Sequence, residues 1–146
     1  MSRARLTTST SQPRATDMFK ITPIQDKDKQ KEICSLCGAQ YRENAFAYMM
    51  YDAENGEIMG MSQFEIGKVG YIYDIREVCG RDDFEAMFIL VRQTMNFIDL
   101  CGAHICHSSY DAADKRLLRA AGFAEQDGIL ICNMTGMFDG HCGGHK

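Results

Sequence analysis

The sequence predicts a single α/β (α+β) domain in which about six strands form one sheet flanked by three helices. Its length favours one domain, because 146 residues lie within the range of one ordinary hydrophobic core. Its periodicity favours a mixed class, because strand-like and helix-like runs alternate along the chain. A third observation is the Asn55-Gly56 pair between two strand-like runs, which is typical of a hairpin turn that requires positive φ.

The N-terminal half of the folded region is predicted to contain four strands and one helix. The strands cover residues 18–24, 45–52, 56–66 and 69–78, and the helix covers residues 26–41. Ile33 and Cys37 fall at helical spacing on the apolar stripe of that helix. In the fourth strand, alternation predicts that Tyr71, Tyr73 and Ile75 lie on one face.

The C-terminal half alternates helix and strand. A long helix is predicted from Asp82 onward, because apolar residues recur at intervals of three and four. These residues are Phe84, Met87, Phe88, Val91, Met95 and Ile98, in a stripe widened by Ile89, Leu90 and Phe97. The elements after it are a strand at 101–109, a helix at 111–123 and a strand at 128–138. Asp111 is expected to be the N-cap of the last helix, and Gly122 its C-terminal stop.

Composition and charge exclude several classes of protein. A net charge of −4, with a sequence pI near 5.5 and no cluster of Lys and Arg, gives no electrostatic reason to expect nucleic acid as a partner. No apolar run approaches the roughly 18 residues that suggest a membrane span. Seven cysteines lie in helix-like and strand-like segments, and the N-terminus has no signal-peptide core, so we expect reduced thiols in the cytoplasm.

The two ends differ in composition from the rest of the chain. Residues 1–17 are rich in Ser, Thr and Arg and almost lack aliphatic residues, which predicts a disordered leader or a cloning remnant. The folded domain is expected at 18–138. Residues 139–146 form a short tail rich in His, Cys and Gly.

The order of these elements resembles the GNAT superfamily of N-acetyltransferases. The resemblance covers about residues 18–138 and is sharpest in FKITPIQDKDKQKEIC, as an opening strand and helix, and in DKRLLRAAGF, as a helix ending in Gly-Phe. It implies a mixed central sheet whose fourth strand, Tyr71–Val78, splays from the fifth, His104–Ser108. It also implies that acetyl-CoA lies in that gap as co-substrate, with an amine as the acceptor.

The resemblance also indicates a cofactor site. In the family, the pantetheine arm pairs with the end of the fourth strand, and pyrophosphate lies on backbone N–H groups of a Gly-rich turn at the start of the central helix. The implied contacts are Ile75, Arg76, Glu77, Val78, Gly80, Arg81, Asp82, Asp83, Phe84, Glu85 and Ala86. This turn departs from the family because Asp82 and Glu85 form a capping-box pattern, and because its carboxylates repel pyrophosphate. We therefore expect acetyl-CoA to bind weakly and mainly through its pantetheine arm.

Catalytic residues are implied only in outline. The family often has a Tyr four residues before the Gly of the Gly-Phe pair, where it protonates the CoA thiolate, and this chain has Leu118 there. Candidates for the general base are Glu77 on the fourth strand and Ser108 on the fifth, and Tyr110 is a candidate acid. The alternatives left open are Asp74 and Glu65 as bases, and Tyr71 and Tyr73 as acids.

An alternative function is that of a non-catalytic protein with the same fold, which binds a partner or zinc. The ligand types that zinc prefers occur at Cys34, Cys37, His141, Cys142 and His145. Their spacing is weakly specific, and Cys37 lies on an apolar stripe where a thiol is an ordinary core residue, so we expect no metal. The sequence does not distinguish a small-molecule amine from a peptide acceptor, or a monomer from a homodimer.

Overall fold

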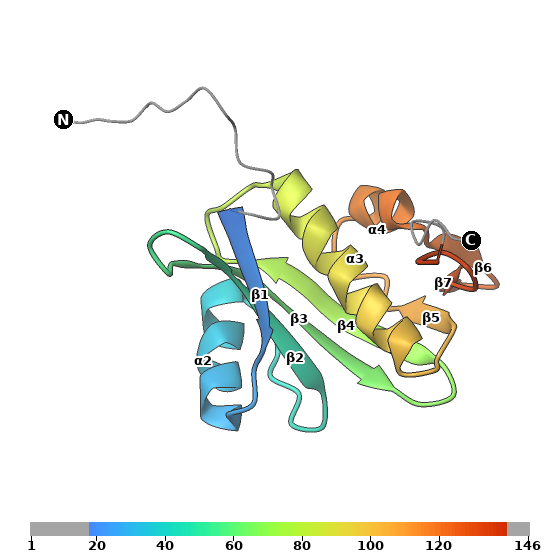
Figure 1. Cartoon of the computed structure of the whole chain (residues 1–146), viewed down its shortest axis with the longest axis horizontal. Helices are drawn as coiled ribbons and strands as arrows, with labels where there is room; N and C mark the ends of the chain where they lie inside the picture. Colours follow the sequence, from blue (N-terminus) through green and yellow to red (C-terminus); the bar gives the residue numbers. More distant parts are fainter. Residues whose placement is uncertain (1–17, 140–146) are drawn as a thin grey trace.

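Figure 1 shows the computed structural model of the chain, which describes residues 18–139. Seven strands form one sheet in the order β1-β2-β3-β4-β5-β7-β6. The strands are β1 (Phe19–Pro23), β2 (Phe46–Asp52), β3 (Ile58–Ile66), β4 (Gly70–Glu77), β5 (Ile105–Ser108), β6 (Ala124–Gln126) and β7 (Ile129–Asn133). The described helices are α2 (Lys27–Cys37), α3 (Phe84–Leu100) and α4 (Lys115–Ala121). The predicted α/β class with a mixed sheet and three helices is confirmed, with one strand more than the predicted six.

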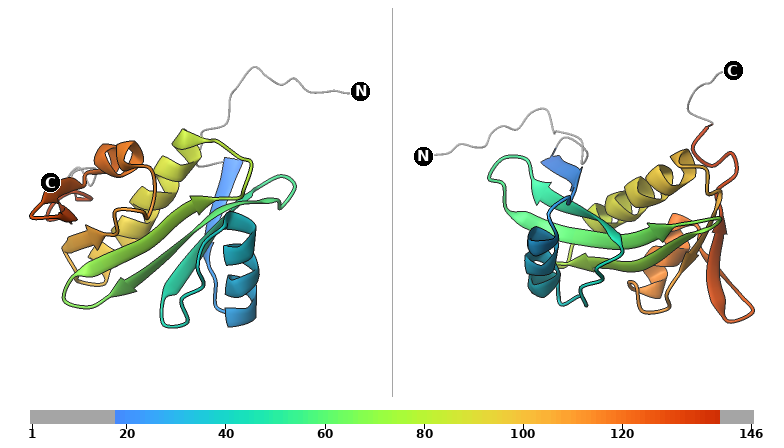
Figure 2. Two further views of the ribbon diagram at one scale, coloured as in Figure 1. Left: turned by 180° about the vertical axis from the view of Figure 1, so that it is seen from behind. Right: turned by 90° about the horizontal axis from the view of Figure 1, so that it is seen from below.

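The sheet is mixed because β4 and β5 run parallel while the other neighbouring strands run antiparallel. Helices α2 and α3 cover opposite faces of it (Figure 2). The larger core lies between the sheet and the helices α3 and α4, and a smaller core lies under α2. Within residues 18–139, no helix is both long and apolar enough to cross a lipid bilayer.

The turn between β2 and β3 agrees with the sequence prediction. Gly56 has φ +76°, and its N–H donates to the carbonyl of Asp52 over 2.9 Å. The side chain of Asp52 accepts from the N–H groups of Glu54 and Asn55, which orders the residues before the glycine. The Asn-Gly signal was therefore sufficient, because a hairpin of this length depends mainly on local chemistry.

Helix α3 begins one residue later than the capping pattern predicted. Its N-cap is Asp83, whose side chain accepts from the N–H of Ala86 over 3.1 Å. The N–H of Asp83 donates to the carboxylate of Glu77 over 2.8 Å. The prediction that Asp82 caps the helix with Glu85 is therefore wrong, because β4 supplies the reciprocal carboxylate from outside the helix.

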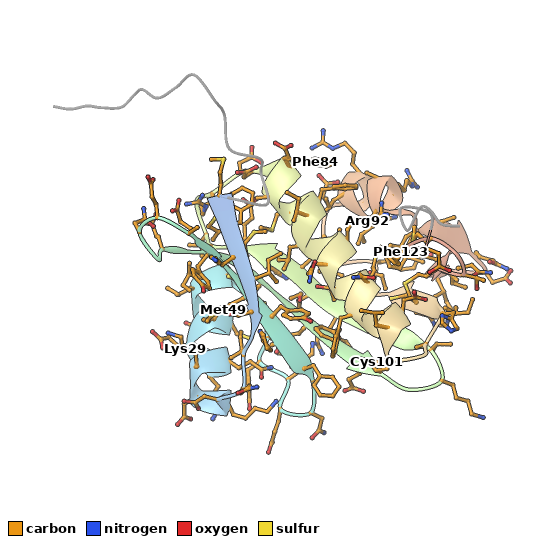
Figure 3. The ribbon with its side chains drawn as sticks, viewed as in Figure 1. Lys29, Met49, Phe84, Arg92, Cys101 and Phe123 are labelled. Carbon is orange, nitrogen blue, oxygen red and sulfur yellow. The ribbon has the colours of Figure 1, made fainter. Side chains whose placement is uncertain are left out.

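Most of the predicted apolar stripe of α3 faces the larger core. Met87, Leu90, Val91, Met95 and Ile98 are almost fully buried there, whereas Phe88, Ile89 and Phe97 are partly buried and pack against it. Phe84 belongs to the same stripe but is 39% exposed. As the first residue of α3, it lies beyond the end of the sheet, on the side towards α4 (Figure 3).

Helix α4 is shorter than predicted. It begins after Asp114, whose side chain accepts from the N–H of Arg116 over 2.8 Å, so Asp111 is not the N-cap. It ends at Gly122 as predicted, where the glycine N–H bonds to the carbonyls of Leu118 and Arg119. The prediction for the start was wrong because the chain before Asp114 is hydrogen-bonded to β4, as described below.

Strand β4 contains a bulge. Between Gln63 and Phe64 of β3 the register with β4 shifts, so that Tyr73 has no partner. The rings of Tyr71 and Tyr73 share one face, with centroids 4.7 Å apart, while Ile75 is buried in the core beneath α3. The prediction that all three residues share a face is therefore wrong, because an extra residue reverses the alternation beyond it.

Candidate functional site

Strands β4 and β5 part after a short parallel pairing. Only three residue pairs join them, namely Gly70 with Cys106, Tyr71 with His107 and Ile72 with Ser108. Beyond Ile72, β5 ends while β4 continues through the bulge to Glu77 (Figure 1). The second half of β4 therefore has no neighbouring strand on the side of β5, beside the starts of α3 and α4.

Residues that follow β5 are hydrogen-bonded to this edge of β4 instead. We call residues Ser109–Ala112 the 109–112 segment. The N–H of Ser109 donates to the carbonyl of Ile72 over 3.0 Å, and the N–H of Ile75 donates to the carbonyl of Ala112 over 2.8 Å. Ala112 is fully buried, and Arg76 Nη2 donates to the carbonyl of Asp111 over 2.7 Å. The segment thus closes the gap between β4 and β5.

A small cavity remains at the end of this gap, with a volume of about 120 Å³. It is lined by Ile75, Glu77, Asp82, Phe84, Met87, Ala113, Asp114, Arg116 and Leu117. Three of the lining residues are acids and one is basic, Arg116, whose guanidinium lies 5.0 Å from the centroid of the Phe84 ring. The cavity is small beside the roughly 300–1,000 Å³ of ordinary ligand pockets. In this conformation it has room for one end of a cofactor arm.

Two backbone N–H groups at the start of α3 are not free to bind phosphate. The N–H groups of Asp83 and Ala86 are already bonded to carboxylates, as described above. Arg81 points to the β2–β3 turn, where its Nη1 lies 3.9 Å from Glu57 Oε1. Burial raises the pKa of the Glu77 carboxyl, and the bond from the Asp83 N–H partly offsets this. The electrostatics of the turn therefore remain unfavourable for a pyrophosphate.

The three candidates for proton transfer do not form one constellation. Glu77 bonds to the start of α3, and the buried Ser108 donates through Oγ to the carbonyl of Ser109 over 3.0 Å. Tyr110 is 38% exposed and donates to Glu125 Oε2 over 2.9 Å. Desolvation and the nearby Glu125 carboxylate raise the pKa of Tyr110.

The buried carboxylate of Asp74 accepts hydrogen bonds from three side chains. It is 2% exposed and accepts from Gln63 Nε2 at 2.7 Å and from the Nε atoms of Arg42 and Arg76, each at 3.2 Å. The Arg42 guanidinium also lies over the Tyr73 ring, 4.5 Å from its centroid. A carboxylate held by three donors is a poor free base, so this alternative loses support.

The α2 face of the gap carries hydroxyl groups. Ser109 Oγ donates to the Tyr71 hydroxyl over 3.4 Å, beside the last pair of β4 and β5. Burial, followed by the carboxylate of Glu65, raises the pKa of Tyr73. The Tyr71 hydroxyl is one of the alternatives for proton transfer. Its bond to Ser109 holds it where β4 and β5 separate.

The position of the expected leaving-group acid lies in the core. Leu118 is fully buried in the larger core, so that position offers no hydroxyl to the gap.

The metal-ligand candidates include two buried thiols. Cys34 and Cys37 are buried under α2, and burial raises their pKa values to about 11 and about 12. Within residues 18–139, no three side chains of Cys, His, Asp or Glu gather as metal ligands would. The other three metal candidates, His141, Cys142 and His145, lie outside the described residues.

Sequence reasoning missed Ala112 and Arg116. Ala112 contributes only its backbone carbonyl, for which a sequence gives no signal. Arg116 could have been found, because an arginine two residues after a helix N-cap lies at the mouth of a gap that opens beside that helix.

Comparisons with known proteins give structural likenesses only. No protein-family model matches the sequence, and no curated protein matches it. The structure is similar to YhhK from E. coli bound to coenzyme A, with a TM-score of 0.56 and 13% identity over 79% of this chain and 98% of that one. It is similar to a protein from Desulfovibrio desulfuricans assigned to the GNAT family of acetyltransferases (TM-score 0.58, 12% identity, 77% and 96% covered). Nourseothricin acetyltransferase is a further similar structure (TM-score 0.58, 11% identity, 78% and 96% covered).

The mixed sheet with a parted pair of central strands is thus a fold that this chain shares with these three solved structures. More narrowly, the chain has the fold of the GNAT superfamily, as the order of its elements predicted. At these identities the likeness concerns the fold alone, and function depends on the site.

Proposed function

We propose that the chain is an acyl-CoA-dependent N-acetyltransferase that acts on an amine, either a small molecule or a peptide. The observation that carries the proposal is the parting of β4 from β5 directly after Ile72, beside the starts of α3 and α4. A parted strand edge offers backbone N–H groups to an extended ligand in the way that a neighbouring strand would.

The proposed reaction uses the backbone of β4. The acceptor nitrogen attacks the thioester carbonyl, a C–N bond forms, the C–S bond breaks, and the CoA thiolate takes up a proton. In this proposal the N–H of Ile75 donates to the thioester carbonyl oxygen, where negative charge develops. Glu77 is the candidate base, since it is half-buried, has a raised pKa and lines the cavity. Ser108, Tyr110 and Tyr71 are the candidate proton donors.

Binding of acyl-CoA requires the 109–112 segment to leave β4. Ile75 cannot donate to a thioester while its N–H donates to Ala112. The cofactor contacts proposed on β4, from Ile75 to Val78, therefore become available only in an open conformation. Those proposed on the turn, from Gly80 to Ala86, are weakened by its carboxylates. We expect weak binding of acetyl-CoA for both reasons.

The second candidate function is that of a non-catalytic protein with the same fold. Three observations favour it: the closed gap, the start of α3 that is already capped by Asp83 and Glu77, and the buried Leu118 in place of a tyrosine. Such a protein would bind a partner through the same fold without transferring an acetyl group.

Calorimetric titration with acetyl-CoA separates the two functions. The enzyme proposal predicts heat of binding with a Kd on the order of 10–500 μM, whereas no heat at millimolar ligand supports the non-catalytic function. A panel of amines is then incubated with acetyl-CoA, and the CoA released is measured by chromatography. A thiol-reactive dye is unsuitable for detecting the released CoA, because it would also react with the exposed Cys79 and Cys101 of the protein.

Glu77→Gln tests the assigned base. It keeps an oxygen that can accept from the Asp83 N–H but removes the proton acceptor, so we expect kcat to fall at least about tenfold with little change in melting temperature. Glu32→Gln, an exposed change on α2, is the control. Equal activity in both variants would remove Glu77 from the mechanism.

A further inference from the structure

A second, larger cavity lies at the other end of α3. Its volume is about 500 Å³, within the range of ordinary small-molecule pockets. It is lined by Pro23, Ile24, Gln25, Lys27, Phe46, Ala47, Tyr48, Phe64 and Phe97. Phe97 lies thirteen residues after Phe84 of the first cavity, roughly 20 Å along the helix. The two cavities therefore share no lining residue.

Four aromatic rings form the walls of this cavity. Tyr48 stacks on Phe64 with centroids 5.6 Å apart, and Phe97 meets Tyr48 edge-on at 5.8 Å and an angle of 80°. Phe46 lies 5.9 Å from Phe64 and is 55% exposed, although it is a large apolar side chain. All four residues line the cavity, and their rings pack on one another by stacking and edge-to-face contacts, the two geometries by which a further ring can be added.

The lining of the cavity contains one charged side chain. None of its residues is acidic, and the one basic residue is Lys27. Its Nζ donates to Gln30 Oε1 over 3.1 Å and to the carbonyl of Ala45 over 2.9 Å. A cationic ligand would therefore lose its hydration here without gaining an ion pair, and an anionic ligand would compete with the two acceptors that already hold the Lys27 ammonium. An uncharged apolar ligand meets neither cost.

We propose that this aromatic cavity, defined by Phe46, Tyr48, Phe64 and Phe97, binds a small uncharged aromatic molecule. Its volume suits one or two fused rings, and its ring geometry favours stacking and edge-to-face contacts over purely aliphatic filling. The inference is independent of the proposed acetyl transfer, because it rests on different residues at the opposite end of α3.

The test uses the full-length protein with indole and with cyclohexanol as a non-aromatic probe. Binding is measured by saturation-transfer NMR and by thermal shift. We expect indole to bind with a Kd on the order of 1 mM or below, to bind more tightly than cyclohexanol, and to raise the melting temperature. Saturating acetyl-CoA should leave the affinity for indole unchanged.

Two variants locate the binding. Phe46→Ala removes the exposed wall of the cavity and should weaken indole binding at least about tenfold. Leu100→Ala removes another exposed apolar side chain, 75% exposed and outside the cavity, and should leave binding unchanged. Phe46→Leu keeps an apolar wall without a ring and should lie between wild type and Phe46→Ala.

Several results would overturn the proposal. One is the absence of indole binding at about 10 mM, well above the expected Kd. Another is equal binding in wild type and Phe46→Ala, or equal affinity for indole and cyclohexanol. A third is a homodimer that Phe46→Ala converts to a monomer, because the cavity would then be an interface between two copies of the chain.

Discussion

Asp83 and Glu77 show how individual carboxylates define the start of the central helix. Each accepts a backbone N–H that would otherwise be free at the first turn of α3. The neighbouring Asp82 is exposed and accepts no hydrogen bond in the described residues. Two adjacent acids thus have different roles, and the capping-box pattern indicated Asp82 instead of Asp83 as the cap.

Asp83→Ala should cost about 0.5–2 kcal/mol of stability, because it leaves the N–H of Ala86 without its acceptor. Asp82→Ala is the matched control and should change the free energy of unfolding by less than about 0.5 kcal/mol. Urea unfolding of both variants measures the difference. A larger loss in Asp82→Ala would mean that the helix begins one residue earlier.

The same two variants separate capping from repulsion of the cofactor. Each removes one negative charge beside the proposed pyrophosphate position, so both should bind CoA more tightly, by roughly two- to tenfold. Only Asp83→Ala should also lose stability. Calorimetry with CoA measures the affinity, and no gain in either variant would show that pyrophosphate lies elsewhere.

The buried thiols give a prediction about pH. Burial raises the pKa values of Cys34 and Cys37 from an ordinary 9.0 to about 11 and about 12. Because the folded-state pKa is the higher one, the stability contributed by the protonated thiols is complete below pH 9 and is lost as the pH rises through 11 and 12. Melting temperature should therefore fall steeply above pH 9.

Alkylation with iodoacetamide checks the same assignment residue by residue. In the native protein at pH 8 it should modify the exposed Cys79 and Cys101 and spare Cys34 and Cys37. Peptide mapping by mass spectrometry, with the urea-unfolded protein as control, gives the extent at each site. Rapid modification of Cys37 at pH 8 would contradict its burial.

At the scale of elements, local chemistry was predictable and pairing was not. The β2–β3 turn and the buried stripe of α3 follow from residues close in sequence. The bulge at Tyr73 depends on register with β3, which no pattern within β4 reveals. Strand β6 was missed because its residues, Ala124–Gln126, are all exposed and have no apolar alternation. Its pairing with β7 makes it a strand.

Gly70→Ala tests the close packing of α3 on β4. A Cβ at Gly70 would lie 2.4 Å from Ile98 Cγ2, so the helix or the strand must shift, and we expect a loss of about 1–3 kcal/mol. Gly67→Ala is the control, because the nearest atom to its Cβ would be 3.8 Å away. Chemical unfolding of both variants gives the comparison. Equal stability would mean that α3 does not approach β4 so closely.

Hydrogen exchange tests the proposed release of the 109–112 segment. When acetyl-CoA binds, peptides that contain this segment should exchange faster, because the bond from the Ser109 N–H to the Ile72 carbonyl of β4 opens. Peptides from the start of α3 should exchange more slowly, since ligand contacts protect them. Mass spectrometry with and without acetyl-CoA measures both. Slower exchange in the 109–112 segment on ligand binding would show that it stays closed.

At the scale of the whole molecule, the sequence predicted the gap between β4 and β5 but not whether that gap is open. The order of the elements places the gap between β4 and β5 because the topology of the fold requires it. Whether that gap is open depends on the backbone of residues 109–112, which pairs with a strand more than thirty positions earlier. Such a contact results from the folded arrangement and leaves no pattern in composition or spacing. The CSLC motif has the same limit, because its spacing alone does not distinguish two cysteines buried on a helix from two metal ligands in a loop.

Because the Ile75 N–H donates to the Ala112 carbonyl, residues 109–112 compete with any ligand that binds the same N–H. Any molecule that needs the Ile75 N–H binds only the fraction of molecules in which the bond is open, so its apparent Kd is the intrinsic Kd divided by that fraction. The Ile75 bond, and the Arg76 bond to Asp111 with its donor one-third exposed, together favour closure by roughly 1.5–3 kcal/mol, which weakens apparent affinity roughly tenfold to more than a hundredfold. A change that loosens residues 109–112 without touching the ligand would therefore strengthen binding, and a partner that held the segment away from β4 would act as an activator.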